Sequence, residues 1–325
     1  MMKLFTSLVP ITAAFMLVVF ADSAGAQQAY PGRPIRLITP YAPGGGTSVV
    51  AHIVGQKLTE SWGQQVLVDN RPGGNTMIGT EALAKSPPDG HTLILVVSTF
   101  AIVPGLFSTP YDPVRDFAPV TTLVNSDYVL VVHPSVPVKT LKELIALAKA
   151  KPNQINYGST GAGGVQHLAG ESLNIMAGIK MQHIPYKGSG QLLPDLMGGH
   201  IQLSFQSPAA SIPYIKNGKL KTIAMGGEKR LPALPDVPTF AEAGLPGLEV
   251  NTWFGILAPA ATPREIIDKL STEIARIMTM PDIIAKMDSL GAYPFVSSPE
   301  KFAALIKADI AKYAKIIKAA KVTAE

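Results

Sequence analysis

The chain has 325 residues, a formal net charge of +5 and no cysteine. A hydrophobic fraction of 47% with a charged fraction of 16% excludes an intrinsically disordered chain, and the lack of cysteine excludes disulfides, thiolate metal sites and cysteine nucleophiles. The basic residues do not form runs with aromatic residues, so the charge indicates a mild attraction for anions and no nucleic acid partner.

Residues 1–26 have the pattern of a cleavable signal peptide. Lys3 precedes a nearly continuous apolar run from Leu8 to Ala21, and small residues follow at Ala24–Ala26. The run of about 14 residues is shorter than a comfortable membrane span, which makes a membrane anchor the weaker alternative. An exported chain without cysteine is typical of the bacterial periplasm, so we expect that location.

The rest of the chain alternates short apolar runs with amphipathic helical patterns. We expect strands at 35–39, 65–69, 92–97, 128–133, 154–157, 181–184, 201–205, 220–225 and 249–257. We expect helices at 47–61, 79–85, 140–150, 165–177, 191–197, 211–217, 263–279, 281–290 and 299–321. Proline-rich residues 226–248 interrupt the pattern and indicate a crossing segment. This order predicts an α/β fold with largely parallel sheets.

Three glycine- and hydroxyl-rich segments each lie between a predicted strand and a predicted helix. They are TPYAPGGGTS (39–48), YGSTGAGGVQH (157–167) and PYKGSG (185–190). Glycine lets the backbone approach a ligand, and the free N–H groups of a helix N-terminus favour an anion. A tight turn without a ligand is the alternative for any one loop. Three loops at strand ends predict a binding site, in a cleft if they divide between two halves.

Catalytic interpretations fit the sequence poorly. A nucleophile elbow around Ser159 would need glycine where Tyr157 stands, and the six histidines are scattered. His167 and Glu171 are one helical turn apart, which is better explained by a surface pair than by a metal site. We therefore expect no enzymatic activity, metal or cofactor. Trp253 is compatible with either a cleft or a core position.

Five segments together resemble the extracytoplasmic receptors of tripartite tricarboxylate transporters, the Bug family. They are YPGRPIRLITPYAPGGGTSVVAH, VLVDNRPGGNTMIGTEALAKSPPDGHTL, INYGSTGAGGVQHLAGESL, IPYKGSGQLLPDLMGGHIQLSF and VNTWFGILAPAATP. The resemblance implies a two-domain, type II-like periplasmic-binding-protein fold with two chain crossings, near 125–129 and 245–250, and a ligand cleft between the domains. Domain one would comprise 27–127 plus 248–325, and domain two 128–247.

The resemblance also implies a function. The chain would be a monomeric, non-enzymatic receptor that captures a dicarboxylate, tricarboxylate or aromatic carboxylate for membrane permease subunits. One alternative is a ligand sensor for a two-component system, docking on a sensor kinase ectodomain. A weaker alternative is a periplasmic hydrolase or transferase that uses the glycine-rich loops as an oxyanion or phosphate site.

In the family, the first-strand loop, here 41–48, holds the ligand carboxylate with the help of ordered water. We expect the backbone of that loop to do most of the recognition, assisted by hydroxyl groups. The candidate ligand contacts are Tyr41, Ala42, Gly44, Gly45, Gly46, Thr47, Ser48, Asn75, Ser98, Thr99, Ser159, Thr160, Gly161, Gly164, His167, Tyr186, Lys187 and Gln206.

This chain differs from many family members at three positions. Ser48 and Gln206 stand where members often have aspartate, and His52 stands where they often have arginine. The loss of two acidic positions predicts a less negative cleft, which favours an anion without an amino group over a zwitterionic amino acid.

Overall fold

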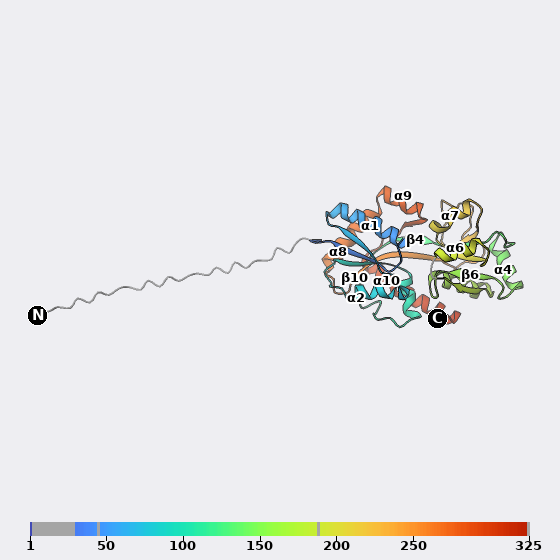
Figure 1. Cartoon of the computed structure of the whole chain (residues 1–325), viewed down its shortest axis with the longest axis horizontal. Helices are drawn as coiled ribbons and strands as arrows, with labels where there is room; N and C mark the ends of the chain where they lie inside the picture. Colours follow the sequence, from blue (N-terminus) through green and yellow to red (C-terminus); the bar gives the residue numbers. More distant parts are fainter. Residues whose placement is uncertain (2–29, 44–45, 187–188, 324–325) are drawn as a thin grey trace.

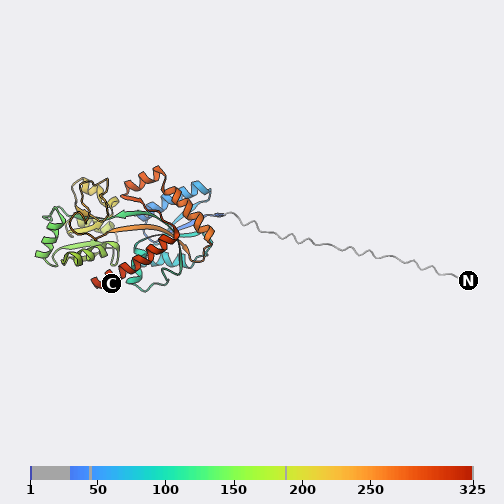
Figure 2. The same ribbon diagram turned by 180° about the vertical axis from the view of Figure 1, so that it is seen from behind.

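The chain folds into two α/β bodies that lie side by side (Figure 1). The computed structural model describes residues 1, 30–43, 46–186 and 189–323, so the predicted signal peptide, apart from Met1, lies outside the described residues. The first body contains both early and late segments of the chain, and the second body contains the middle of the chain (Figure 2). No helix in the described ranges is long and apolar enough to cross a membrane.

The first body is built on a six-stranded sheet with the order β11-β4-β10-β3-β1-β2. Its strands are β1 (Ile35–Thr39), β2 (Val66–Asn70), β3 (Thr92–Val97), β4 (Phe117–Asp127), β10 (Asn251–Pro259) and β11 (Ala292–Pro294). Its helices are α1 (Gly46–Trp62), α2 (Met77–Ala84), α3 (Thr99–Ile102), α8 (Arg264–Met278), α9 (Pro281–Ser289) and α10 (Pro299–Ala320), with 3-10 turns at Gly74–Thr76 and Val103–Gly105.

The second body is built on a five-stranded sheet with the order β7-β6-β8-β5-β9. Its strands are β5 (Val129–Val132), β6 (Asn156–Ser159), β7 (Gln182–Pro185), β8 (Leu203–Gln206) and β9 (Lys221–Met225). Its helices are α4 (Leu141–Ala150), α5 (Val165–Ala177), α6 (Ser189–Met197) and α7 (Pro208–Lys216).

The expectation of largely parallel sheets was wrong. The named strands form four parallel and five antiparallel pairings in the described part of the chain. The antiparallel pairings involve β4, β5 and β10, the strands next to the two chain crossings. β4 leads into β5 without an intervening helix, and β10 returns antiparallel to β4, so these strands are not part of βαβ units.

The last helix is fixed to the long strand β10. Ser298 caps α10 by accepting a hydrogen bond from the backbone N–H of Lys301 at 3.3 Å, and Pro299 occupies the first helical turn. The Phe302 ring packs against Gly255, where a Cβ atom would lie 2.3 Å from the ring. Trp253 is 3% exposed and donates from Nε1 to Asp309 at 2.7 Å, so it belongs to the core.

Backbone hydrogen bonds join the two crossings. The Tyr128 N–H donates to the Val250 carbonyl at 2.8 Å, and the Gly226 N–H donates to the Tyr128 carbonyl at 2.8 Å. The strands on either side belong to different sheets, since β4 ends at Asp127 and β5 begins at Val129. The domain boundaries at 127/128 and 247/248 stay a prediction, which this arrangement of sheets supports.

Candidate functional site

The loop after β1 is held by a side chain that the sequence analysis missed. Asn70, the last residue of the neighbouring strand β2, donates from Nδ2 to the Thr39 hydroxyl at 2.6 Å and to the Tyr41 carbonyl at 2.9 Å. The same nitrogen lies 3.4 Å from the Ser48 hydroxyl. One amide group thus connects the end of β1 to the first turn of α1. The available signal was an amide residue directly after a predicted strand.

Helix α1 presents its N-terminus at this loop. It is 17 residues long, begins at Gly46 and has no acidic residue in its first turn. Among the described residues, a Cβ atom on Gly46 would have no neighbouring atom within 4 Å, so this part of the chain leaves the space beside the terminus open. The aligned peptide dipoles and the free N–H groups make such a terminus favourable for an anion.

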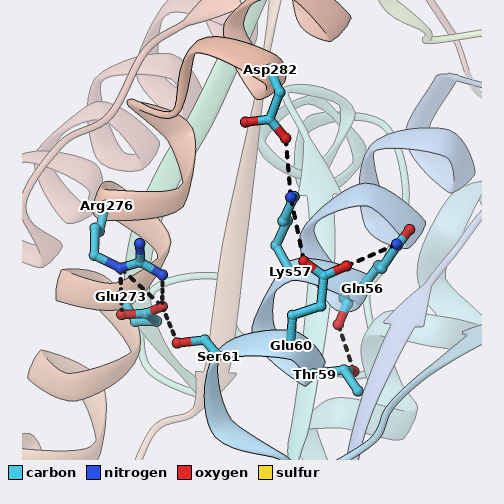
Figure 3. Close-up of polar contacts among 9 residues, drawn as sticks. Gln56, Lys57, Thr59, Glu60, Ser61, Glu273, Arg276 and Asp282 are labelled. Atoms are coloured by element: carbon cyan, nitrogen blue, oxygen red, sulfur yellow. Dashed lines mark hydrogen bonds and ion pairs between the residues drawn. The ribbon is translucent and has the colours of Figure 1, made fainter.

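Contacts with α8 and α9 hold the rest of α1 (Figure 3). The Lys57 ammonium lies 3.0 Å from the Asp282 carboxylate on α9. The Ser61 hydroxyl donates to Glu273 on α8, which also pairs with Arg276. Helix α1, whose N-terminus faces the loop, is therefore connected by side-chain contacts to α8 and α9.

Hydroxyl groups and phenols lie beside the loop at the end of β3. The Ser98 and Thr252 hydroxyls are 2.7 Å apart. Burial raises the pKa of Tyr41, and the nearby Thr99 hydroxyl and Tyr128 phenol shift it in opposite directions. Tyr128 and Thr252 were absent from the predicted site residues, because both lie inside predicted strands, 128–133 and 249–257.

In the second body, the loop after β6 is closed by its own side chains. The Ser159 hydroxyl donates to the Gly161 carbonyl at 2.8 Å and lies 2.6 Å from His183 Nε2. Gln166 accepts from the Thr160 N–H at 2.7 Å and donates to the Phe205 carbonyl at 2.6 Å, which links the loop to β8. Two glycines in the left-handed φ region, Gly161 (φ 143°) and Gly163 (φ 73°), make this path possible.

The two bodies touch beside this loop. A Cβ atom on Gly163 would lie 2.2 Å from Leu106 Cδ1, and Leu106 follows the short turn after α3. A Cβ atom on Gly291 would similarly lie 2.2 Å from Pro208, at the start of α7. The junction therefore brings the loop after β6 next to the segment that begins with Ser98 and Thr99.

The predicted site residues divide into two groups by exposure. Five are buried, with exposed fractions of 3%, 1%, 0%, 7% and 1% for Ser48, Ser98, Ser159, His167 and Gln206. In this conformation their polar atoms bond to neighbouring groups of the protein, and direct contact of these side chains with a ligand stays a prediction. The exposed or half-buried residues are Tyr41, Ala42, Gly46, Thr47, Asn75, Thr99, Thr160, Gly161, Gly164 and Tyr186. Gly44, Gly45 and Lys187 lie outside the described residues.

A separate cavity of about 660 Å³ lies beside the first crossing and contains none of the predicted site residues. Asp127 and Glu228 line it, together with Tyr293. Burial raises the pKa of Asp127 to about 6. Asp127 is the buried carboxyl group of this lining, which also contains exposed Lys229 and Arg230. A buried carboxyl group disfavours an anion beside it, so we do not place the carboxylate ligand there.

Metal coordination receives no support from the described residues: they contain no group of three or more His, Cys, Asp or Glu placed to hold an ion. The Ser159–His183 contact has the spacing of a nucleophile and a base. Ser159 is fully buried, however, and its hydroxyl is bonded within its own loop. The Ser159–His183 contact therefore has a structural role in the loop after β6.

The chain is similar to known proteins along nearly its whole length. A family model described as "Tripartite tricarboxylate transporter family receptor" matches residues 50–322. A UPF0065 protein from the tcbD–tcbE intergenic region of Pseudomonas sp. (strain P51) is 36% identical over 312 residues, covering 94% of this chain and 93% of the relative. Protein BugT of Bordetella pertussis (strain Tohama I) is 33% identical over 316 residues, covering 96% and 97%.

Solved structures with bound carboxylates share the fold. An R. palustris protein with adipate has a TM-score of 0.84 and 34% identity, covering 90% of this chain and 99% of the other. MatC from Rhodopseudomonas palustris with bound malate has a TM-score of 0.79 and 29% identity, covering 89% and 100%. This chain therefore belongs to the tripartite tricarboxylate transporter receptor family and has the two-domain fold of periplasmic binding proteins.

Proposed function

We propose that this protein is a periplasmic receptor that captures a small organic carboxylate, with a dicarboxylate such as adipate or malate as the first candidate, and delivers it to the permease subunits of a tripartite transporter. The observation that carries the proposal is the open N-terminus of α1, which has no acidic residue in its first turn and is held in place by Asn70. The adipate and malate bound by structural neighbours support this ligand class.

Recognition in this proposal relies on the backbone. A carboxylate at the start of α1 accepts hydrogen bonds from free N–H groups and interacts favourably with the helix dipole. The exposed or half-buried hydroxyls of Thr47, Thr99 and Thr160 can add hydrogen bonds, whereas those of Ser48, Ser98 and Ser159 are buried. This assignment replaces our expectation that Ser98 and Ser159 assist the ligand directly.

We also expect the two bodies to close around the ligand, because two chain crossings connect them. The two crossings, bonded to each other through Tyr128, are the segments that can act as a hinge. A ligand that contacts loops of both bodies binds the closed form more tightly and shifts the protein toward it. The closed form would be the state that the permease recognises.

We propose a receptor without catalytic activity, acting as a monomer. The described residues give no specific support to the alternatives of a periplasmic hydrolase and of a sensor for a two-component system. The hydrolase needs an accessible nucleophile, but Ser159 is fully buried.

A pair of substitutions at Gly46 tests the proposed anion site. Gly46→Asp and Gly46→Asn place side chains of nearly equal size in open space, and they differ in charge. A carboxylate beside the helix terminus repels the ligand, so Gly46→Asp should weaken adipate binding on the order of tenfold or more relative to Gly46→Asn. Without ligand, Gly46→Asp should be the more stable of the two, because an acidic residue favours a helix N-terminus.

Isothermal titration calorimetry with adipate, malate, citrate and benzoate measures the binding, and thermal unfolding measures the stability. A sugar panel serves as the negative control. Equal carboxylate affinities in the two variants would exclude the α1 terminus as the anion site. A response to sugars with none to any carboxylate would exclude the proposed function.

A further inference from the structure

Two histidines from different elements stack beneath the loop after β6. The imidazole rings of His167, in the first turn of α5, and His183, on β7, have centroids 3.6 Å apart and planes inclined by 7°. His167 is 7% exposed. Sequence separation hides the pair, since 15 residues lie between them and neither belongs to a metal motif.

Each ring holds a different part of the loop. The Gly163 N–H donates to His167 Nδ1 at 3.0 Å, so that nitrogen carries no proton. The Ser159 hydroxyl donates to the Gly161 carbonyl at 2.8 Å. Its oxygen accepts from the Gly161 N–H at 3.2 Å and has a second lone pair that can accept from His183 Nε2 at 2.6 Å. Both rings therefore fit the loop as neutral imidazoles with the proton on Nε2.

The groups around the pair do not favour a positive charge. Tyr157 lies beside both rings, and its hydroxyl donates to Glu171 at 2.6 Å. The Glu171 carboxylate also accepts from Asn174, and among the described residues it forms no hydrogen bond with either imidazole. Burial lowers the pKa of His167 to about 4, and burial together with the neighbouring ring lowers the pKa of His183 to about 3.

We infer that His167 and His183 are positioning residues that hold residues 159–164 in the conformation required for ligand capture, and that they do so as a neutral stacked pair. A proton on His167 Nδ1 would face the Gly163 N–H and break that hydrogen bond. This inference rests on the proposed function, because it assigns the loop to the ligand. His167, which the sequence analysis placed among the ligand contacts, acts here through the loop.

The first test uses the protein without ligand. NMR spectra of protein labelled with ¹⁵N should show the Nε2–H tautomer for His167 at neutral pH, and the Gly163 amide shift should follow the titration of His167 as the pH falls. His167→Leu should lower the exchange protection of the Gly163 amide on the order of tenfold, and His167→Gln should restore much of it, because the glutamine oxygen can accept the same hydrogen bond.

His200→Gln, which changes an exposed histidine in the same body, is the matched control and should leave the loop amides unchanged. A Gly163 amide shift that stays constant while His167 titrates would overturn the inference. Unchanged protection in His167→Leu would overturn it as well. Both outcomes are independent of whether any carboxylate binds.

The second test connects the pair to binding. His183→Phe keeps an aromatic ring in the stack but removes the hydrogen bond to Ser159, so it should weaken adipate binding on the order of fivefold, with His200→Gln unchanged. A loosened loop with unchanged adipate affinity would overturn the link to capture. If wild type binds no carboxylate at all, the proposed function fails, and the amide measurements alone decide how the loop is held.

Discussion

Asp127 is a buried carboxyl group at the point where the chain leaves the first body. It is the last residue of β4 and is 3% exposed. The hydroxyl of Tyr293 approaches its Oδ1 at 3.4 Å, and the nearby charge of Glu228 disfavours ionisation further. Burial raises its pKa from 3.8 to about 6. Replacement by asparagine removes the ionisable group and keeps the side-chain shape.

The raised pKa of Asp127 determines whether its contribution to folding stability rises or falls with pH. The folded state keeps its proton up to about pH 6, whereas the unfolded state loses it near pH 3.8. The stability that protonated Asp127 contributes is therefore fully present below pH 3.8 and is lost as the pH rises through about 6. Between about pH 4.5 and about pH 8, the wild type should lose about 2 kcal/mol from Asp127, and Asp127→Asn should not.

Urea unfolding of wild type and Asp127→Asn at these two pH values measures the effect. Relative to wild type, the free energy of unfolding of the variant should increase by about 2 kcal/mol between the acidic and the alkaline condition. Asp236→Asn, at an exposed position, serves as the control; it keeps Asp127, so its free energy of unfolding should follow that of wild type at both pH values. A variant that becomes less stable than wild type as the pH rises would show that the Asp127 carboxylate has a favourable partner, and the reasoning from burial would be wrong.

Four further substitutions at three positions test the packing and the loop. Gly255→Ala should destabilise the protein by about 1–3 kcal/mol in urea unfolding, because its methyl group overlaps the Phe302 ring. Trp253→Phe removes the donor to partly buried Asp309, so it should cost about 1–3 kcal/mol at neutral pH and less in acid, where Asp309 is protonated. An equal loss at both pH values would contradict this. Asn70→Ala should lower adipate affinity by about tenfold in calorimetry, and Asn70→Asp should not restore it, because the loop needs the amide as a donor.

Much of the secondary structure could be predicted from local patterns. The strand at 92–97 and the helix at 165–177 form at the predicted residues, since a continuous apolar run and an amphipathic period are local signals. The prediction missed β4, whose sequence FAPVTTLVNSD contains proline and polar residues. Its buried Thr122 hydroxyl donates to the Phe295 carbonyl, a partner far away in the sequence that no local pattern reveals.

The candidate site was predictable as a set of loops but not as a set of contacts. Glycine-rich segments between strands and helices indicate where a backbone can meet a ligand. Which hydroxyls remain free depends on distant residues: Ser98 pairs with Thr252, and Ser159 lies against His183. Asn70 escaped notice for the same reason, because its role comes from the pairing of β1 with β2.

Two of the three departures from the family pattern, Ser48 and Gln206, acquire a physical meaning from their positions. Ser48 and Gln206 are 3% and 1% exposed, with Ser48 in the first turn of α1 and Gln206 bonded to Ser204 inside the second sheet. An aspartate at either position would be a buried charge behind a ligand loop, where solvent screens it weakly. Such a charge would oppose an anion at the α1 terminus, the site that we propose, and would attract an ammonium group. With neutral residues at both positions, the helix terminus acts without this opposition, which supports a carboxylate ligand that lacks an amino group.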